Sequence, residues 1–169
     1  GKASPSGKLP VTFYHNEALA EMPSFEDYSL RNRTYRYYTG EPLYPFGYVL
    51  TYGDIQVTAL SADRDEAVVT AVNKGGAVTE DVLQLYIKDI ESTDAPTNPI
   101  LCGFQRIALE AGEEKTVTVP IDPKAFTVVN AEGQRVSGSG TWVLYAGTGQ
   151  PDSRTAELTG KGCLSVSLN

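Results

Sequence analysis

The chain has 169 residues, a formal net charge of −7 at pH 7 and a hydrophobic content of 41%. Its length corresponds to about one domain of ordinary size. No apolar run approaches the ~20 residues that a membrane-spanning helix needs, so we expect no membrane partner. An acidic chain would be repelled by a phosphate backbone, and we therefore expect no nucleic-acid partner.

Charged and aromatic residues divide unevenly at Gly53. Residues 1–53 carry five basic and five acidic side chains, eight of the ten Tyr and three of the five Phe, but only seven Val, Ile or Leu. The whole net charge therefore lies in residues 54–169, which hold twenty-eight Val, Ile or Leu. This division predicts two parts, an N-terminal extension (residues 1–53) and a compact body (residues 54–169).

The extension is predicted to be mostly irregular because five prolines interrupt it. Only residues 9–14 are typical of a strand, and a short helix could begin within residues 17–22. So few aliphatic residues cannot form a separate core. We therefore expect the aromatic side chains of the extension to be buried against the body, a second copy of the chain or a partner chain. The residues concerned are Tyr35, Tyr37, Tyr38, Tyr44, Phe46, Tyr48 and Tyr52.

The body is predicted to consist of short strands, because apolar and polar residues alternate with period two between turn signals. The predicted strands are residues 55–60, 67–72, 82–87, 103–109, 116–121, 126–130, 140–146, 155–158 and 164–168. No stretch shows a helical stripe. The pattern predicts an all-β fold, an antiparallel β-sandwich of the immunoglobulin or fibronectin type III-like kind.

Two aromatic residues of the body are predicted to lie in its core. Trp142, between Thr141 and Val143, is expected to anchor the space between the sheets because an indole buries a large area. The alternative is an exposed platform on which a sugar ring stacks. Phe104 is likewise expected in the core.

Residues that could carry chemistry are sparse. Adjacent carboxylates occur at 26–27, 65–66, 80–81 and 113–114, but neighbours on a strand point to opposite faces, so we expect them to be solvated. The single His15 and the distant Cys102 and Cys163 do not form a zinc pattern. We expect no catalytic residue, metal or cofactor, and the two thiols are either free or bridged.

Two stretches of the extension resemble the C-terminal portion of glycoside hydrolase family 3, the β-glucosidases and β-xylosidases. They are Pro5-Ser-Gly-Lys-Leu-Pro-Val-Thr-Phe-Tyr14 and Arg33-Thr-Tyr-Arg-Tyr-Tyr-Thr-Gly-Glu-Pro-Leu-Tyr-Pro-Phe-Gly-Tyr48. In the body, residues 82–87, 103–107 and 113–117 resemble the fibronectin type III-like domain of that family. The chain departs from the family pattern at Val49, where a Gly is usual, and at Cys102, where a Lys is common.

The resemblance implies a part of a retaining glycosidase without its active site. Family members cleave a terminal β-linked sugar with two carboxyl groups. Their nucleophile belongs to an N-terminal barrel and their acid/base usually to the following α/β domain, and no residue of this sequence matches either motif. By the resemblance, residues 1–53 are the end of the α/β domain plus a linker, and residues 54–169 are the fibronectin type III-like sandwich.

The Tyr-rich residues 33–48 have two possible interpretations. In the first, they form an interdomain linker whose aromatic side chains pack on the catalytic domain. In the second, one or two of Tyr35, Arg36, Tyr37 and Tyr38 reach the rim of the sugar pocket, where a ring can stack on a pyranose and Arg can donate to hydroxyls.

These observations predict a non-catalytic accessory module that stabilises a family 3 glycosidase and its domain or subunit contacts. The parent enzyme would hydrolyse terminal β-linked glucose or xylose, in the cytoplasm or after secretion, and the chain alone is expected to be inactive. Its expected partners are the catalytic domains of the parent or a second protein chain, including a second copy in a homodimer. An independent carbohydrate-binding module is the alternative function.

Overall fold

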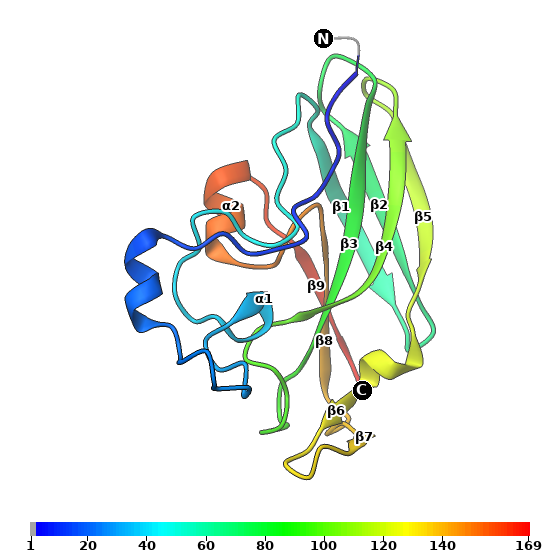
Figure 1. The fold of residues 1–169 in the computed structure, drawn as a ribbon. Coiled ribbons are helices and arrows are strands. Elements are labelled where there is room, and N and C mark those ends of the chain that lie inside the picture. The colour runs from blue at the N-terminus through cyan, green and yellow to red at the C-terminus, as the bar shows by residue number, and fades with distance from the viewer. Residues whose placement is uncertain (1–2) are drawn as a thin grey trace.

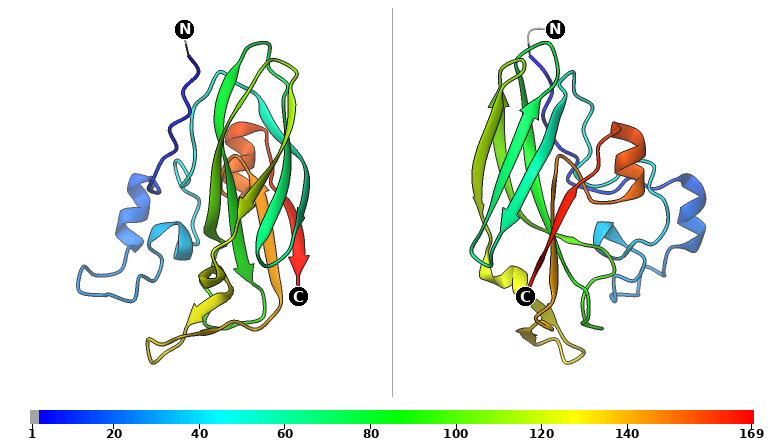
Figure 2. Two further views of the ribbon diagram at one scale, coloured as in Figure 1. Left: turned by 90° about the vertical axis from the view of Figure 1, so that its right-hand side faces the viewer. Right: turned by 180° about the vertical axis from the view of Figure 1, so that it is seen from behind.

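The computed structural model describes residues 3–169, which form a two-layer β-sandwich with an irregular segment along one side (Figure 1). The sandwich begins at β1, and the segment before it, drawn in blue to cyan, lies beside the strands in all three views (Figures 1 and 2). None of the helices in residues 3–169 is long and apolar enough to cross a membrane.

The sandwich has one sheet of three strands and one of four, and every strand pair is antiparallel. The first sheet has the order β1-β2-β5, with β1 at Ile55–Ala62, β2 at Glu66–Asn73 and β5 at Glu114–Pro120. The second has the order β4-β3-β8-β9, with β3 at Thr79–Asp89, β4 at Ile100–Leu109, β8 at Trp142–Gly147 and β9 at Leu164–Leu168. A small hairpin joins β6 (Thr127–Val129) to β7 (Arg135–Ser137), after a 3-10 helix, η2, at Pro123–Phe126. The predicted antiparallel β-sandwich is confirmed.

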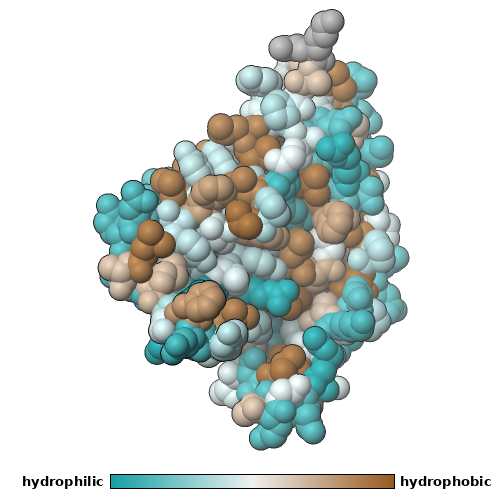
Figure 3. Space-filling view, viewed as in Figure 1, coloured by the Kyte–Doolittle hydropathy of each residue, from teal (hydrophilic) through white to brown (hydrophobic). Residues whose placement is uncertain are grey.

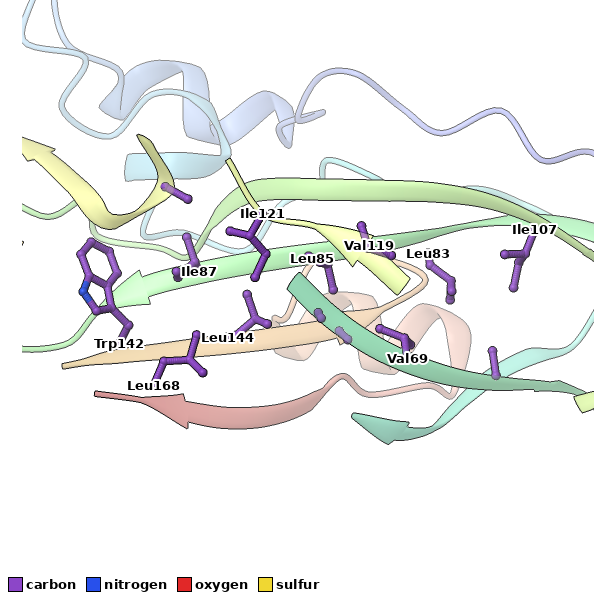
Figure 4. Packing of buried hydrophobic residues seen from close by; sticks show 14 of the residues in the cluster. Val69, Leu83, Leu85, Ile87, Ile107, Val119, Ile121, Trp142, Leu144 and Leu168 are labelled. Atoms are coloured by element: carbon purple, nitrogen blue, oxygen red, sulfur yellow. The ribbon is translucent and has the colours of Figure 1, made fainter. Parts of the chain in front are cut away.

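The core lies between the two sheets and is built from alternate residues of each strand. Figure 4 shows the inward side chains meeting between the layers, among them Val69 and Val119 from the first sheet and Leu83, Leu85 and Leu144 from the second. All five are at most 1% exposed. Burying one such side chain contributes roughly 1.5–3 kcal/mol, so these alternate apolar residues stabilise the packing of the two sheets.

Of the two aromatic residues predicted in the core, one is buried and one is not. Trp142 is 2% exposed and meets the ring of Phe126 edge-on, with 5.5 Å between ring centroids, which confirms the prediction. Phe104 is 66% exposed, so the prediction for it was wrong. The reason is strand parity, because Ile107 and Leu109 of β4 point inward and Phe104, an odd number of positions away, points outward.

One predicted strand is a helix. Residues 155–158 lie in α2 (Ser153–Thr159), which begins after Asp152 and ends at Gly160. The carboxylate of Asp152 accepts a hydrogen bond from the backbone N–H of Thr155 at 2.6 Å, and Gly160 has a φ of 68°. An N-capping Asp and a left-handed Gly after the last turn are the usual ends of a helix, so this pair was the signal that the strand prediction overlooked.

The extension contains one 3-10 helix, η1 (Asn16–Glu21), and one short turn of α-helix, α1 (Thr34–Tyr37). The short helix expected within residues 17–22 therefore exists in 3-10 form. The strand predicted over residues 9–14 is reduced to a single bridge between Phe13 and Tyr44. Residues 9–13 and 44–48 also contact each other at a second point, because the backbone N–H of Leu9 donates to the carbonyl of Tyr48 at 2.9 Å.

Candidate functional site at the seam between extension and sandwich

The extension is fastened to the outer side of β3 by a chain of buried hydrogen bonds. Leu83 and Leu85 point into the core, so Gln84 and Tyr86 between and after them point to the other side of the sheet. Both are nevertheless buried, at 3% and 0% exposed. The hydroxyl of Tyr86 donates to Oε1 of Gln84 at 2.5 Å, and Nε2 of Gln84 donates to the carbonyl of Gly47 at 3.1 Å. The extension is therefore the cover that buries these polar side chains.

Glycine is the only residue type that fits at position 47, where the extension contacts Gln84 of β3. Its φ is 78°, which L side chains rarely adopt. A Cβ placed there would lie 2.4 Å from Oε1 of Gln84 and 2.8 Å from the hydroxyl of Tyr86. The glycine of the Phe46-Gly47-Tyr48 run is therefore required by close approach of the extension to the sheet as well as by its backbone conformation.

Tyr35, one of the candidate rim residues, is part of the same seam. Its ring stacks on Phe46 with 4.2 Å between centroids and an interplanar angle of 12°, and it meets Tyr86 edge-on at 6.3 Å. Its hydroxyl accepts a hydrogen bond from the backbone N–H of Leu101 at 3.0 Å. The carbonyls of Tyr35 and Tyr38 both accept from Nδ2 of Asn98, at 2.9 and 2.8 Å. These contacts join α1 to the chain that enters β4.

The other three candidates differ from one another. Arg36 is exposed, and its guanidinium lies 5.9 Å from the centroid of the Tyr35 ring. Tyr38 is buried, meets Tyr14 edge-on at 4.8 Å, and has a pKa raised chiefly by burial. Tyr37 is half-buried. The structure therefore brings Tyr35 and Tyr38 to the seam, and a role at a sugar-pocket rim remains a hypothesis for all four.

The expected burial of the aromatic side chains holds for part of the set. Tyr38 and Tyr48 are buried, and Tyr35, Tyr37 and Phe46 are half-buried. Tyr44 is 40% exposed and Tyr52 is 83% exposed, so these two are not covered by the sandwich.

An ion pair that the sequence analysis missed ties the start of the extension to β3. Nζ of Lys8 lies 2.6 Å from the carboxylate of Asp81, and it also donates to the carbonyl of Thr148 at 2.6 Å. Asp81 is 3% exposed, so its predicted solvation was wrong, whereas its neighbour Glu80 is exposed and pairs with Arg106 at 3.2 Å. Burial lowers the pKa of Lys8, and the Asp81 carboxylate opposes that shift.

Both thiols are free, which settles the alternative left open by the sequence. Cys102 and Cys163 each donate weakly to a backbone carbonyl at 3.4 Å. Burial raises the pKa of each thiol to about 12. Since the thiolate is the reactive form, neither is an activated nucleophile.

A pocket of about 340 Å³ opens beside this seam, between residues 38–42 of the extension and residues 150–154 that lead into α2. Seven of the residues that line it are Thr12, Tyr35, Tyr38, Asn98, Gln150, Asp152 and Arg154. Burial raises the pKa of Asp152, and Arg154 pairs with Glu157 at 2.6 Å. Within residues 3–169 no three His, Cys, Asp or Glu side chains gather in a metal-binding group.

Exposed apolar side chains concentrate on the extension. Nine of the fifteen large hydrophobic side chains that are exposed in residues 3–169 belong to it, and Figure 3 shows brown side chains over that part of the surface. The nine are Val11, Phe13, Leu19, Phe25, Tyr28, Leu30, Tyr44, Leu50 and Tyr52. Phe13, Tyr44 and Leu50 also line an apolar groove of about 390 Å³.

Comparisons with known proteins agree with this architecture. Residues 81–150 match the family model described as fibronectin type III-like domain. The chain is 32% identical over 166 residues to a xylan 1,4-β-xylosidase of Xylanibacter ruminicola, an alignment that covers 94% of this chain and 19% of that protein. It is 33% identical over 151 residues to the thermostable β-glucosidase B of Acetivibrio thermocellus, covering 78% of this chain and 20% of that protein.

Solved structures show the same relationship. A β-glucosidase from Chaetomella raphigera superposes with a TM-score of 0.79 at 26% identity, over 100% of this chain and 27% of that one. DesR, a β-glucosidase from Streptomyces venezuelae, superposes with a TM-score of 0.75 at 27% identity, over 97% of this chain and 23% of that one. The chain thus spans about a fifth of the length of the curated relatives that it matches. It contains a fibronectin type III-like domain and resembles the C-terminal portion of the β-glucosidases and β-xylosidases of glycoside hydrolase family 3.

Proposed function

We propose that the chain is a non-catalytic accessory module of a family 3 glycosidase and that it stabilises the enzyme through the extension. The parent enzyme would hydrolyse terminal β-linked glucose or xylose. The observation that carries the proposal is the two-sided character of the extension. One side is fastened to β3 through Gly47 and Tyr35, and the other presents exposed apolar side chains.

The exposed side has the composition of an interface. Phe25, Tyr28 and Tyr52 are each more than 80% exposed, and Phe13, Tyr44 and Leu50 line one apolar groove; exposed apolar surface of this kind marks interaction sites on soluble proteins. The extension also holds eight of the ten Tyr of the chain, and aromatic enrichment characterises the buried centre of protein interfaces.

The proposed occupant of this face is the remainder of the enzyme. The chain covers only 19% and 20% of the relatives named above, and each alignment extends over most of this chain. The residues of the extension would then belong to the end of the α/β domain and its linker, and the apolar groove at Phe13, Tyr44 and Leu50 would receive side chains of the catalytic portion.

The test compares the same substitutions in the isolated chain and in the full-length enzyme that carries it. The double variant Phe25→Ser/Tyr28→Ser removes two exposed aromatic side chains of the extension. We expect its melting temperature to be unchanged in the isolated chain and lowered by several degrees in the full-length enzyme. The matched control is Phe104→Ser, which removes an exposed aromatic side chain of the sandwich.

Two outcomes would overturn the proposal. One is an equal effect of the double variant in both contexts, since the exposed aromatic side chains would then have no partner in the enzyme. The other is turnover of a chromogenic β-glucoside or β-xyloside by the isolated chain above a buffer blank. If the isolated chain instead forms a stable dimer that the double variant disrupts, a second copy is the occupant.

A further inference from the structure

Four residues that line the pocket beside α2 each have a buried hydrogen-bonding atom without a partner. Within residues 3–169, seven buried side-chain nitrogen or oxygen atoms have no hydrogen-bond partner. Four of them belong to residues that line this one pocket: Oγ1 of Thr12, Oε1 of Gln150, Oδ2 of Asp152 and Nε of Arg154. Buried polar atoms are normally paired with protein or water, and a ligand in this pocket would lie beside more of these unpaired atoms than a ligand in any other pocket within residues 3–169.

The side chain with the clearest deficit is Gln150, which is 7% exposed and has no partner for its carbonyl oxygen. It lies at the turn between β8 and α2, opposite residues 38–42 of the extension. Its neighbour Asp152 uses Oδ1 to cap α2, which leaves Oδ2 free to accept. Two unpaired acceptor atoms, on Gln150 and Asp152, therefore lie two positions apart in the sequence.

The unpaired set defines the chemistry of the missing partner. It contains two acceptors, Gln150 and Asp152, one donor, Arg154, and one hydroxyl, Thr12, which can do both. Hydroxyl groups on a ligand satisfy such a mixture, because each can donate to one atom and accept from another.

Other ligand classes fit this wall less well. A phosphate would face the carboxylates of Asp152 and Glu41 with a single cation, Arg154, which is already paired with Glu157 at 2.6 Å. A metal ion would find only those two carboxylates among the residues that line the pocket. The volume of about 340 Å³ is at the lower end of the ~300–1,000 Å³ typical of small-molecule sites, and Tyr35 and Tyr38 supply aromatic walls.

We propose that this pocket binds a small, uncharged, hydroxyl-rich molecule, a monosaccharide or a polyol. The four unpaired atoms are covered in the free chain, so binding includes a rotation that turns the amide of Gln150 toward the ligand. The residues that line the pocket all belong to this chain, so its binding is tested separately from the accessory role proposed above.

The experiment is a calorimetric titration of the full chain with D-glucose, D-xylose and the open-chain polyol sorbitol. We expect saturable binding of at least one of them, with a Kd of about 1–10 mM, and at least tenfold weaker binding by Gln150→Leu. The matched control is Gln56→Leu, which alters a glutamine in the wall of a different pocket of about 390 Å³ and should bind as the unmodified chain does. Binding of the two sugars but not sorbitol would assign the site to a pyranose ring, and the reverse would assign it to an open-chain polyol.

A second measurement covers the case in which Gln150→Leu does not fold. In two-dimensional NMR of the unmodified chain, the side-chain amide signals of Gln150 should move with the same concentration dependence as the heat of binding. The proposal is overturned if none of the three compounds saturates below about 100 mM with those signals unmoved, or if a folded Gln150→Leu binds as tightly as the unmodified chain.

Discussion

The amide of Gln84 donates to the carbonyl of Gly47 at 3.1 Å, across 37 residues of sequence and from the sheet to the extension. Around this contact Tyr86 donates to Gln84, and Tyr35 lies with its ring against both Phe46 and Tyr86. At Gln84 and Tyr86 the outer side of β3 is thus as buried as its core side, which a sandwich strand facing water would not be.

Replacing Gly47 tests how tightly the seam is packed. We expect Gly47→Ala to destabilise the chain by roughly 2–4 kcal/mol, because it adds a steric clash to an unfavourable φ. Gly133→Ala is the matched control, since Gly133 has a nearly equal φ of 75° but no atom within 4 Å of the added Cβ. The control should cost about 1–2 kcal/mol. Urea unfolding measures both, and equal losses would show that Gly47 is not under steric constraint.

Two substitutions of Tyr35 separate what its ring contributes to stability from what its hydroxyl contributes. Tyr35→Phe leaves the backbone N–H of Leu101 without its acceptor and should cost about 1 kcal/mol. Tyr35→Ala also removes the contacts with Phe46 and Tyr86 and should cost about 3–5 kcal/mol. The measurement is chemical denaturation of the isolated chain. A Tyr35→Ala variant as stable as the unmodified chain would favour the rim hypothesis over a role in the seam.

The ion pair of Lys8 and Asp81 tests whether the start of the extension is held by a buried charge. Lys8→Met leaves the Asp81 carboxylate buried at 3% exposure without its cation, and we expect a loss of about 3–5 kcal/mol. The double variant Lys8→Met/Asp81→Leu should recover most of that loss, because both charges are then absent. The exposed pair of Arg106 and Glu80 provides the comparison, since Glu80→Gln should cost at most about 1 kcal/mol. A Lys8→Met effect as small as that would contradict a buried pair.

The raised pKa values of the two thiols predict that the free energy of unfolding falls at alkaline pH. In the folded chain burial raises the pKa of Cys102 and of Cys163 from the ordinary value of 9.0 to about 12. Above pH 9 the unfolded state therefore holds fewer protons than the folded state, and stability falls as the pH rises toward 12. Each thiol contributes a slope of up to about 1.4 kcal/mol per pH unit. Cys102→Ala/Cys163→Ala should unfold with a shallower pH dependence between pH 9 and 10.5, and an unchanged slope would contradict the burial of the thiols.

The sequence predicted the sandwich because burial of alternate residues is a local signal. In the sequence of residues 82–87, apolar residues occur at every second position, and three of them, Leu83, Leu85 and Ile87, lie in the core. The same reasoning placed Phe104 on the wrong side, although Phe104 is an odd number of positions from Ile107 and Leu109, which point inward. It also took residues 155–158 for a strand, although Asp152 and Gly160 bracket them as helix ends.

The seam and the pocket could not be predicted in the same way, because both join residues that are distant in the chain. Lys8 and Asp81 are separated by 73 positions, and neither is unusual in its own surroundings. Tyr35 was found as a candidate from its motif, but its partner Tyr86 looked like an ordinary strand residue. Asp152 and Gln150 had no motif, and only the path of the extension brings Tyr38 beside them.

The most direct test of the accessory role is hydrogen–deuterium exchange of the isolated chain compared with the full-length enzyme that carries it. The account predicts that amides of residues 19–30 and 49–52 exchange quickly in the isolated chain and become protected in the enzyme, while those of β3 are protected in both. Equal exchange of residues 19–30 and 49–52 in the two proteins would contradict it, because the exposed face of the extension would then have no partner in the enzyme.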